Sequence, residues 1–238
     1  MDNVQQKQEE EYSRPYHYFI NRNSRVGLFY YSYIQPVIDY IEKKENFTIL
    51  DAGCGDGFVE SMLGDKNKIY GVDYSERAIK FAKLFNEESK SKTFSCQSIS
   101  DLDFSGDYFD LIVNLAVFEH IRPDVCGDVL KELNRVIKGD GKLIMAVPTK
   151  NLPKPGKHYR HFCYDEIETL LKDNGFFIDE YSYVFNKNFN YIAKFIDNSA
   201  WQISFLLKFL GKIFRKYFIS ANKKNGLMML IFCKKINK

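Results

Sequence analysis

Three glycines that follow a short β-rich run constrain this chain more than any other feature. Residues 47–51 (FTILD) have the apolar and β-branched character of a buried strand, and Gly53, Gly55 and Gly57 come soon after them. Glycine lacks a Cβ atom, so it suits a place where the backbone approaches a ligand closely. The N–H groups of such a loop and of the following helix favour an electron-rich ligand. A strand–helix turn without any ligand is the alternative at this point.

An acidic residue at the end of the next predicted strand narrows the ligand class. Asp73 ends the run KIYGVD and lies about 20 residues beyond the loop, the position of a ribose-binding carboxylate in nucleotide-binding folds. A nicotinamide or flavin dinucleotide fits these two features. The dinucleotide fingerprint G-x-G-x-x-G is incomplete, however, because the third glycine comes one position early and Phe58 occupies its place. A nicotinamide-dependent reductase is therefore the weaker hypothesis.

Predicted strands alternate with predicted helices along most of the chain. The apolar pattern predicts strands at 47–51, 68–73, 93–96, 109–115, 142–147, 176–184 and 227–233. It predicts helices at 26–44, 75–88, 124–138 and 164–174, whereas residues 1–24 are polar and expected to be mobile. This alternation is typical of an α/β fold with a doubly wound parallel sheet. A length of 238 residues fits a single domain.

Cysteine usage and charge bear on location and partners. The five cysteines are scattered without a C-x-x-C pair, which indicates a reducing compartment. The polar N-terminus contains no apolar signal core, so we expect a cytoplasmic protein. From Lys187 onward the chain carries 11 Lys and Arg against one acid, Asp197. This end therefore either meets an anionic partner or neutralises the acidic remainder of the chain.

Residues 201–219 have the pattern of a basic amphipathic helix. Apolar residues share one broad face at helical spacing, and the opposite face gathers Lys208, Lys212, Arg215 and Lys216. These charges disfavour a membrane-spanning helix and favour one that lies peripherally at the inner face of the membrane. A cap on the domain and a helix at a homodimer interface are the alternatives. Nucleic-acid contact is the least favoured hypothesis.

Five segments, taken in order, point to a family. They are ILDAGCGDG, GVDYSERAI, FDLIVNLAVFEHI, LNRVIKGDGKLIMAVP and a helix–strand unit centred on Gly175 and Phe176. Over residues 47–184 the chain resembles a class I S-adenosylmethionine-dependent methyltransferase. The branch that it resembles contains the quinone-biosynthesis, sugar and natural-product O-methyltransferases. The resemblance implies a Rossmann-like sheet of seven strands whose last strand, residues 227–233, is antiparallel.

The resemblance also implies an organisation and an activity. Residues 1–46 would form a helical lid, 47–184 the cofactor-binding core, 185–226 an insertion and 227–238 the last strand. The implied reaction is O-methylation of a small-molecule or lipid-linked acceptor with S-adenosyl-L-methionine. N-methylation of a small molecule, and cofactor binding without turnover, stay open as alternatives. A nucleic-acid methyltransferase is disfavoured, because the chain has neither an N/D-P-P-Y/F motif nor a Pro-Cys nucleophile.

The family motifs assign a set of cofactor-binding residues to this chain. They are Asp51, Gly53, Cys54, Gly55, Asp73, Tyr74, Gln97, Ser98, Asn114 and Leu115. Asp51 would orient the methionine end of the cofactor, and Asp73 would accept hydrogen bonds from both ribose hydroxyls. Tyr74 would stack on the adenine. Gly53 to Gly55 would supply the close backbone, and the backbone at 114–115 would line the site.

This chain departs from the family pattern after the third predicted strand. Family members often carry an Asp there that binds the adenine amine, whereas this chain has Gln97 next to Ser98. An amide carbonyl can accept the same hydrogen bond. The resemblance therefore still assigns the adenine amine to Gln97.

Two histidine groups are candidates for the chemistry. Methyl transfer from a sulfonium is an in-line displacement, and a general base is needed only for a hydroxyl or protonated amine acceptor. His120 is the candidate base. Glu119 would orient His120, contact it without touching the substrate, or belong to a metal site. The alternative is that the pair only fixes the following helix. His161, in the H-Y-R-H run at 158–161, is the second catalytic candidate or a structural anchor. One Glu–His pair does not establish a metal site, so no metal ion is predicted.

Overall fold

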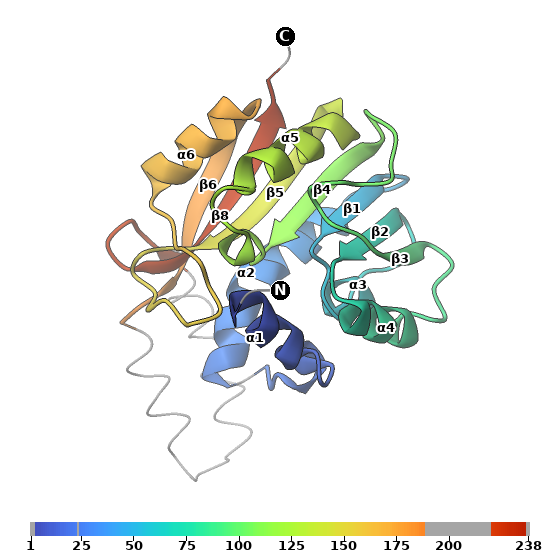
Figure 1. Cartoon of the computed structure of the whole chain (residues 1–238), viewed down its shortest axis with the longest axis horizontal. Helices are drawn as coiled ribbons and strands as arrows, with labels where there is room; N and C mark the ends of the chain where they lie inside the picture. The colour runs from blue at the N-terminus through green and yellow to red at the C-terminus, as the bar shows by residue number, and fades with distance from the viewer. Residues whose placement is uncertain (1–2, 23, 189–219, 237–238) are drawn as a thin grey trace.

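The computed structural model describes residues 3–22, 24–188 and 220–236 (Figure 1). The helices are α1 (Asn3–Glu11), η1 (Tyr16–Phe19), α2 (Arg25–Ile41), α3 (Phe58–Ser61), α4 (Glu76–Phe85), η2 (Phe118–His120), α5 (Cys126–Val136) and α6 (Tyr164–Asp173), where η marks a short 3-10 helix. The strands are β1 (Thr48–Ala52), β2 (Lys68–Asp73), β3 (Lys92–Cys96), β4 (Phe109–Leu115), β5 (Ile137–Pro148), β6 (Phe176–Asn186), β7 (Ser220–Ala221) and β8 (Gly226–Lys235). The amphipathic pattern predicted at 201–219 lies outside the described residues, as does most of the insertion predicted at 185–226.

The strands form one sheet in the order β3-β2-β1-β4-β5-β8-β6-β7. Neighbouring strands from β3 to β5 pair in parallel, whereas β8 runs antiparallel to both β5 and β6. The predicted doubly wound sheet with an antiparallel last strand is therefore confirmed. The two-residue strand β7, which pairs with β6 at the edge, is an addition that the sequence does not predict.

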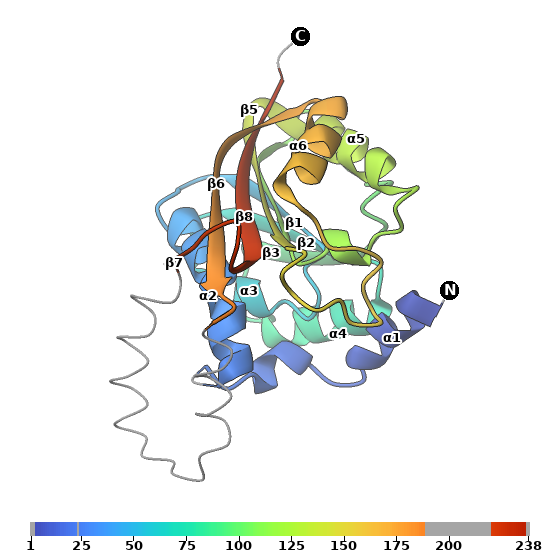
Figure 2. The same cartoon turned by 90° about the vertical axis from the view of Figure 1, so that its left-hand side faces the viewer.

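Helices cover both faces of the sheet (Figure 2). On one face, α5 and α6 bury Leu133 and Leu171 in a core that also contains Phe109. On the other face, α2 buries Ile34 and α3 contributes Val59 to a second core. Because the central strands are covered on both sides, β4 and β5 consist of nearly continuous apolar runs.

Several helix ends follow directly from local chemistry. The Ser75 side chain accepts a hydrogen bond from the Ala78 N–H at 3.1 Å and caps α4. The predicted helix 124–138 ends earlier, at Val136, and the chain continues at once into β5. The reason is that Ile137 pairs with Phe109 in the sheet and is fully buried there.

The N-terminal segment corrects the expectation that residues 1–24 are mobile. It contains α1 and η1, and both contact the domain through polar side chains. The Gln8 side chain accepts a hydrogen bond from the Tyr74 hydroxyl at 2.8 Å, and Glu11 pairs with Lys157 at 2.7 Å. A polar helix of this kind is stabilised by contacts with the rest of the molecule, which its own sequence does not reveal.

The structure bears on whether a helix of the chain could span a membrane. None of the helices in the part of the chain that the structure describes has the length and apolar character needed to cross a bilayer.

The two-sided core generates a stability prediction. Leu133 is fully buried on α5, whereas Leu84 on α4 is 57% exposed. Leu133→Ala should lower the free energy of unfolding by about 2–5 kcal/mol, because it leaves a cavity in the core. Leu84→Ala should change it by no more than about 0.5 kcal/mol. Urea denaturation of both variants checks this, and equal losses would contradict the assigned core.

Candidate active site

The described residues form a cavity of about 810 Å³ at the carboxyl ends of the parallel strands. Asp51 at the end of β1, Asp73 at the end of β2 and Leu115 at the end of β4 all line it. The cavity also reaches Glu119 and His120 beyond β4. Ligands in open α/β sheets bind at this edge, and the volume suits an organic ligand of substantial size.

The glycine loop closes over this edge with left-handed backbone. Gly53 has a φ of 97°, and a Cβ atom there would lie 2.4 Å from the Val117 side chain. Gly57 has a φ of 74°, and a Cβ atom there would lie 2.8 Å from the backbone of Ala82 on α4. Gly57 thus supports close helix packing although it comes one position early for the dinucleotide fingerprint.

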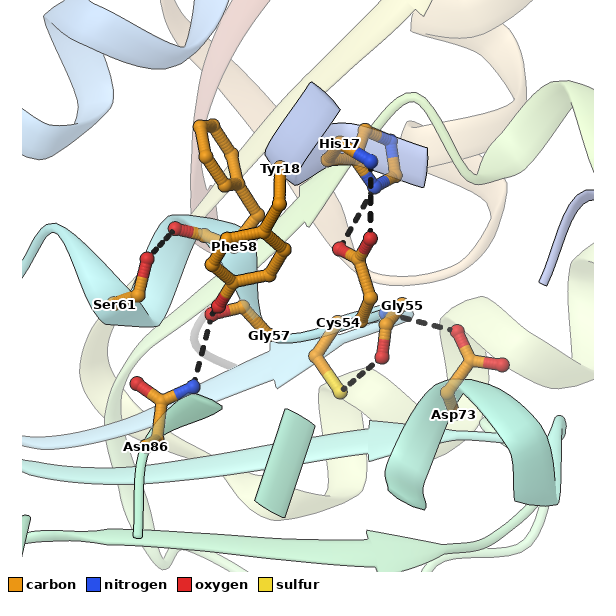
Figure 3. A network of polar contacts seen from close by, with 10 residues as sticks. His17, Tyr18, Cys54, Gly55, Gly57, Phe58, Ser61, Asp73 and Asn86 are labelled. Atoms are coloured by element: carbon orange, nitrogen blue, oxygen red, sulfur yellow. Dashed lines mark hydrogen bonds and ion pairs between the residues drawn. The ribbon is translucent and has the colours of Figure 1, made fainter. Parts of the chain in front are cut away.

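Asp73 ties the loop to β2. Its carboxylate accepts a hydrogen bond from the Gly55 N–H at 3.1 Å (Figure 3). It also accepts one from the Ser75 N–H at 2.9 Å. Burial raises the pKa of Asp73 to about 6, although these two N–H groups lower it. A carboxylate oxygen can accept more than one hydrogen bond, so Asp73 keeps acceptor capacity for ligand hydroxyls.

The N-terminal segment lies against the same loop. His17 donates to the buried carboxylate of Asp56 through its ring at 2.8 Å and through its backbone N–H at 3.0 Å. The Tyr18 hydroxyl donates to the Gly57 carbonyl at 3.2 Å (Figure 3). Tyr12 lines the cavity beside Gly55. These contacts hold η1 and the end of α1 over the loop.

Most of the predicted cofactor residues line the cavity. They are Asp51, Gly53, Cys54, Gly55, Asp73, Tyr74, Ser98 and Leu115. Asn114 does not line it, because its amide is fully buried and donates to the Ala52 carbonyl at 2.7 Å. Asn114 therefore joins β4 to β1 instead of facing a ligand.

Gln97 does not line the cavity either, and its assignment to the adenine stays a prediction. Its amide nitrogen donates to the Ser95 hydroxyl at 2.8 Å, and its carbonyl accepts from the Asp103 N–H at 2.9 Å. The cavity is lined instead by the neighbouring residues Ser98 and Ile99.

Glu119, His120, His158 and His161 form a cluster beyond the carboxyl ends of β4 and β5. Glu119 and His120 belong to η2, and His158 and His161 come from the loop after β5. His120 Nδ1 lies 2.9 Å from the Lys157 carbonyl, and His161 Nδ1 lies 3.0 Å from the Leu152 carbonyl. A carbonyl only accepts, so Nδ1 carries the hydrogen in both rings.

The tautomer of His158 follows from that of His161. His161 Nε2 is left with a lone pair, and it lies 2.8 Å from His158 Nδ1. His158 Nδ1 must therefore donate, which leaves a lone pair on His158 Nε2. His120 and His158 both line the cavity, whereas His161 does not. This arrangement favours the structural-anchor alternative for His161, which contacts His158, and a catalytic role of His161 stays a prediction. The sequence analysis includes His158 in the H-Y-R-H run but does not select it as a candidate.

Burial sets the charge of this cluster. It lowers the pKa of His120 to about 4, so this imidazole is neutral near pH 7. It raises the pKa of Glu119 to about 8. One ligand atom each from Glu119, His120 and His158 lie within 4.8 Å of one another. The sequence predicts no metal site, yet two imidazoles and a carboxylate are a donor set that could hold a divalent metal ion.

Comparisons with known proteins place the chain in a family. Residues 50–145 match the model of a methyltransferase domain. The chain is 33% identical over 165 residues to a ubiquinone biosynthesis O-methyltransferase of Coxiella burnetii. The aligned region covers 60% of this chain and 70% of that protein. It is 31% identical over 155 residues to an uncharacterized protein of Methanocaldococcus jannaschii, which covers 65% of this chain and 64% of that relative's length.

A solved structure supports the same fold. Magnesium protoporphyrin IX methyltransferase from Synechocystis, determined with bound S-adenosylmethionine, superimposes with a TM-score of 0.65 at 16% identity. The match covers 99% of this chain and 98% of that one. The chain therefore belongs to the S-adenosylmethionine-dependent methyltransferases. Its cofactor is S-adenosylmethionine, and the glycine loop, Asp51 and Asp73 fit that group, because they offer close backbone and buried carboxyls to a cationic nucleoside.

Asp73 generates the first test of this site. Asp73→Ala should weaken S-adenosylmethionine binding by roughly 1.5–3 kcal/mol for each charge-assisted hydrogen bond lost. Asp103→Ala removes an exposed acid that does not line the cavity and should leave affinity unchanged. Calorimetric titration measures both, and an unaltered affinity in Asp73→Ala would remove Asp73 from the site.

Proposed function

We propose that the chain transfers a methyl group from S-adenosylmethionine to a hydroxyl of a small-molecule or lipid-linked acceptor. The observation that carries this proposal is a cavity of about 810 Å³ that is lined by two groups of residues of different chemistry. Asp73 and the glycine loop form one group, and Glu119, His120 and His158 form the other. A cavity of this size can hold an acceptor beside a cofactor. The Coxiella relative, an O-methyltransferase by name, supports an oxygen acceptor.

His120 and Glu119 are groups that can take part in proton transfer from the methyl acceptor. When bound, the cofactor supplies a methyl group on a sulfonium, which is displaced in line. His120, neutral and hydrogen-bonded to a carbonyl through Nδ1, offers its Nε2 lone pair to an O–H group. Glu119 Oε2 is buried with no hydrogen-bond partner among the described residues. Because burial raises the pKa of this carboxyl to about 8, it is protonated near pH 7 and can donate or accept a hydrogen bond beside His120. We retain His120 as the base and Glu119 as its neighbour in the reaction.

Part of the cavity wall is apolar. Phe29, Val125, Leu152 and Met228 belong to it. Such walls favour an acceptor with an apolar body and exclude water from the reacting atoms. An amine acceptor would use the same groups, so N-methylation is the second candidate. A protein that binds the cofactor without turnover is the third.

A label-transfer experiment identifies the acceptor class. The protein is incubated with S-adenosylmethionine that carries a labelled methyl group, together with either a polar metabolite extract or a lipid extract of host cells. We expect label in one small molecule or lipid, with the methyl group on oxygen by mass spectrometry. Label on nitrogen would support the second candidate. No label in either extract, with cofactor binding intact, would support binding without turnover.

The base generates its own prediction. His120→Ala should lower turnover on the labelled acceptor by roughly 10²–10⁴-fold, because the proton then has no acceptor at that position. Cofactor affinity should stay nearly unchanged, since the family motifs assign the cofactor to the glycine loop, Asp51 and Asp73 and not to His120. Steady-state kinetics and calorimetry separate the two effects. Unchanged turnover would return His120 to a structural role.

A lipid-linked acceptor would place the protein at a membrane, and the pattern of residues 201–219 supports this on sequence grounds. Binding to anionic vesicles should exceed binding to neutral ones and fade as salt rises, because charge attraction is screened over about 10 Å at 0.1 M. Reversal of Lys208, Lys212, Arg215 and Lys216 to Glu should abolish it. Flotation that leaves the unaltered protein in solution with every lipid would contradict this part of the proposal.

A further inference from the structure

The hydrogen bonds around His120 and His158 fix which ring nitrogen of each can bind a metal ion. Nδ1 of His120 donates to the Lys157 carbonyl at 2.9 Å. Nδ1 of His158 donates to Nε2 of His161 at 2.8 Å. Each of the two rings therefore carries its lone pair on Nε2. Histidines that bind metal ions have this arrangement, in which the other ring nitrogen is held by a hydrogen-bond acceptor.

A buried carboxyl lies beside these two imidazoles. Glu119 is 2% exposed, and its Oε2 has no hydrogen-bond partner among the described residues. One ligand atom from each of Glu119, His120 and His158 lies within 4.8 Å of the other two. Zinc–ligand distances are about 2.0–2.2 Å, so small side-chain rotations bring all three atoms onto one ion. Such an ion would also satisfy the carboxyl oxygen, which is costly to bury alone.

Backbone contacts hold the two segments of this cluster together. The Tyr159 N–H donates to the Glu119 carbonyl at 2.9 Å, and the His158 N–H donates to the Pro155 carbonyl at 3.1 Å. The rings of His120 and His158 meet edge to face, with their centroids 4.6 Å apart. The three side chains are therefore brought together by contacts that do not depend on an ion.

The types of donor atom indicate the class of ion. Two imidazole nitrogens and one carboxylate oxygen form the open zinc sites of enzymes, in which water or a ligand completes the coordination. Mg²⁺ and Ca²⁺ prefer oxygen ligands instead. Glu119, His120 and His158 all line the cavity, so the remaining coordination position faces the cavity.

Two lysines lie near the cluster, and each has an acceptor of its own. Lys157 pairs with Glu11 at 2.7 Å, and Lys154 donates to the His158 carbonyl at 3.2 Å. Glu11 thus offsets the charge of Lys157. Glu119 gives up its hydrogen to solvent when it binds a metal ion, because only the deprotonated carboxylate is a ligand. A cation therefore meets one carboxylate and two imidazole lone pairs.

We propose that Glu119, His120 and His158 form a site for one divalent metal ion of the zinc class, and that an ion bound there blocks methyl transfer. The blocking rests on the proposed function, in which Nε2 of His120 takes the proton of the acceptor hydroxyl. A metal ion on that nitrogen uses the same lone pair, so the occupied protein has lost its base. His161 is a positioning residue of the site, because it fixes the tautomer of His158.

Calorimetric titration of the full chain with Zn²⁺, and in parallel with Mg²⁺, tests the site. We expect one Zn²⁺ per chain and no binding of Mg²⁺. His158→Gln and Glu119→Gln each remove a ligand, so zinc affinity should fall by about 100-fold or more. His17→Gln is the matched control, because His17 lines the same cavity and binds the carboxylate of Asp56. Its zinc affinity should equal that of the unaltered chain.

Absence of zinc binding would overturn the site. Equal zinc affinity in His158→Gln, Glu119→Gln and the unaltered chain would overturn it as well, because zinc would then bind elsewhere. Far-ultraviolet circular dichroism shows whether each variant is folded, and either of the two variants is sufficient for this comparison.

Two substitutions of His161 test its positioning role. His161→Phe keeps all three ligands but removes the acceptor of His158 Nδ1–H, so zinc affinity should fall by about 10–100-fold. His161→Gln supplies a carbonyl that can accept this hydrogen bond, so it should recover part of the affinity. Unaltered affinity in His161→Phe would contradict the positioning role. Equal losses in His161→Phe and His161→Gln would contradict it too.

The blocking is tested by turnover of the acceptor that the label-transfer experiment identifies. Turnover by the metal-free protein should fall at least about tenfold with one equivalent of Zn²⁺ and recover when a chelator is added. Unchanged or increased turnover with zinc bound at the site would overturn the blocking. Absence of turnover with and without zinc, with cofactor binding intact, would overturn the proposed function and the blocking with it. The zinc titrations decide the site in either case.

Discussion

The turn that follows β1 depends on glycine at every second position from 53 to 57, and the site depends on that turn. Gly53, Gly55 and Gly57 have positive φ angles. With this backbone the N–H groups of residues 53 and 54 reach the Val72 carbonyl at 2.8 and 3.0 Å, which ties the end of β1 to the end of β2. The loop, Asp51 and Asp73 therefore line one cavity. A side chain at Gly57 would push α4 away and open this arrangement.

The glycine loop gathers several acidic side chains in the protein interior. It brings Asp51, Asp56, Asp73 and Glu60 into the interior, each less than 10% exposed. His17 binds Asp56, and backbone N–H groups bind Asp73. Burial raises the pKa of Asp51 to about 7 and raises the pKa of Glu60 as well. An environment of this kind favours a cationic ligand with hydroxyl groups.

The strands could be predicted from the sequence because burial leaves a local signal. Lys68–Asp73 and Phe109–Leu115 have the predicted bounds, since turn residues flank short apolar runs. The family resemblance implies a helical lid over residues 1–46, but local patterning does not reveal the helix Asn3–Glu11. This helix is polar except for Val4 and depends on distant partners such as Tyr74 and Lys157. Tertiary contacts also determine which of the predicted site residues line the cavity. Gln97 is bound by Ser95 and Asp103, and His161 faces His158, relations that no spacing along the chain reveals.

The central claim is that this cavity binds S-adenosylmethionine. Calorimetric titration of the unaltered protein with S-adenosylmethionine, and in parallel with NAD, tests it most directly. The geometry of the glycine loop and the buried carboxyls predicts one S-adenosylmethionine per chain and no binding of NAD. Tight binding of NAD with none of S-adenosylmethionine would contradict the account.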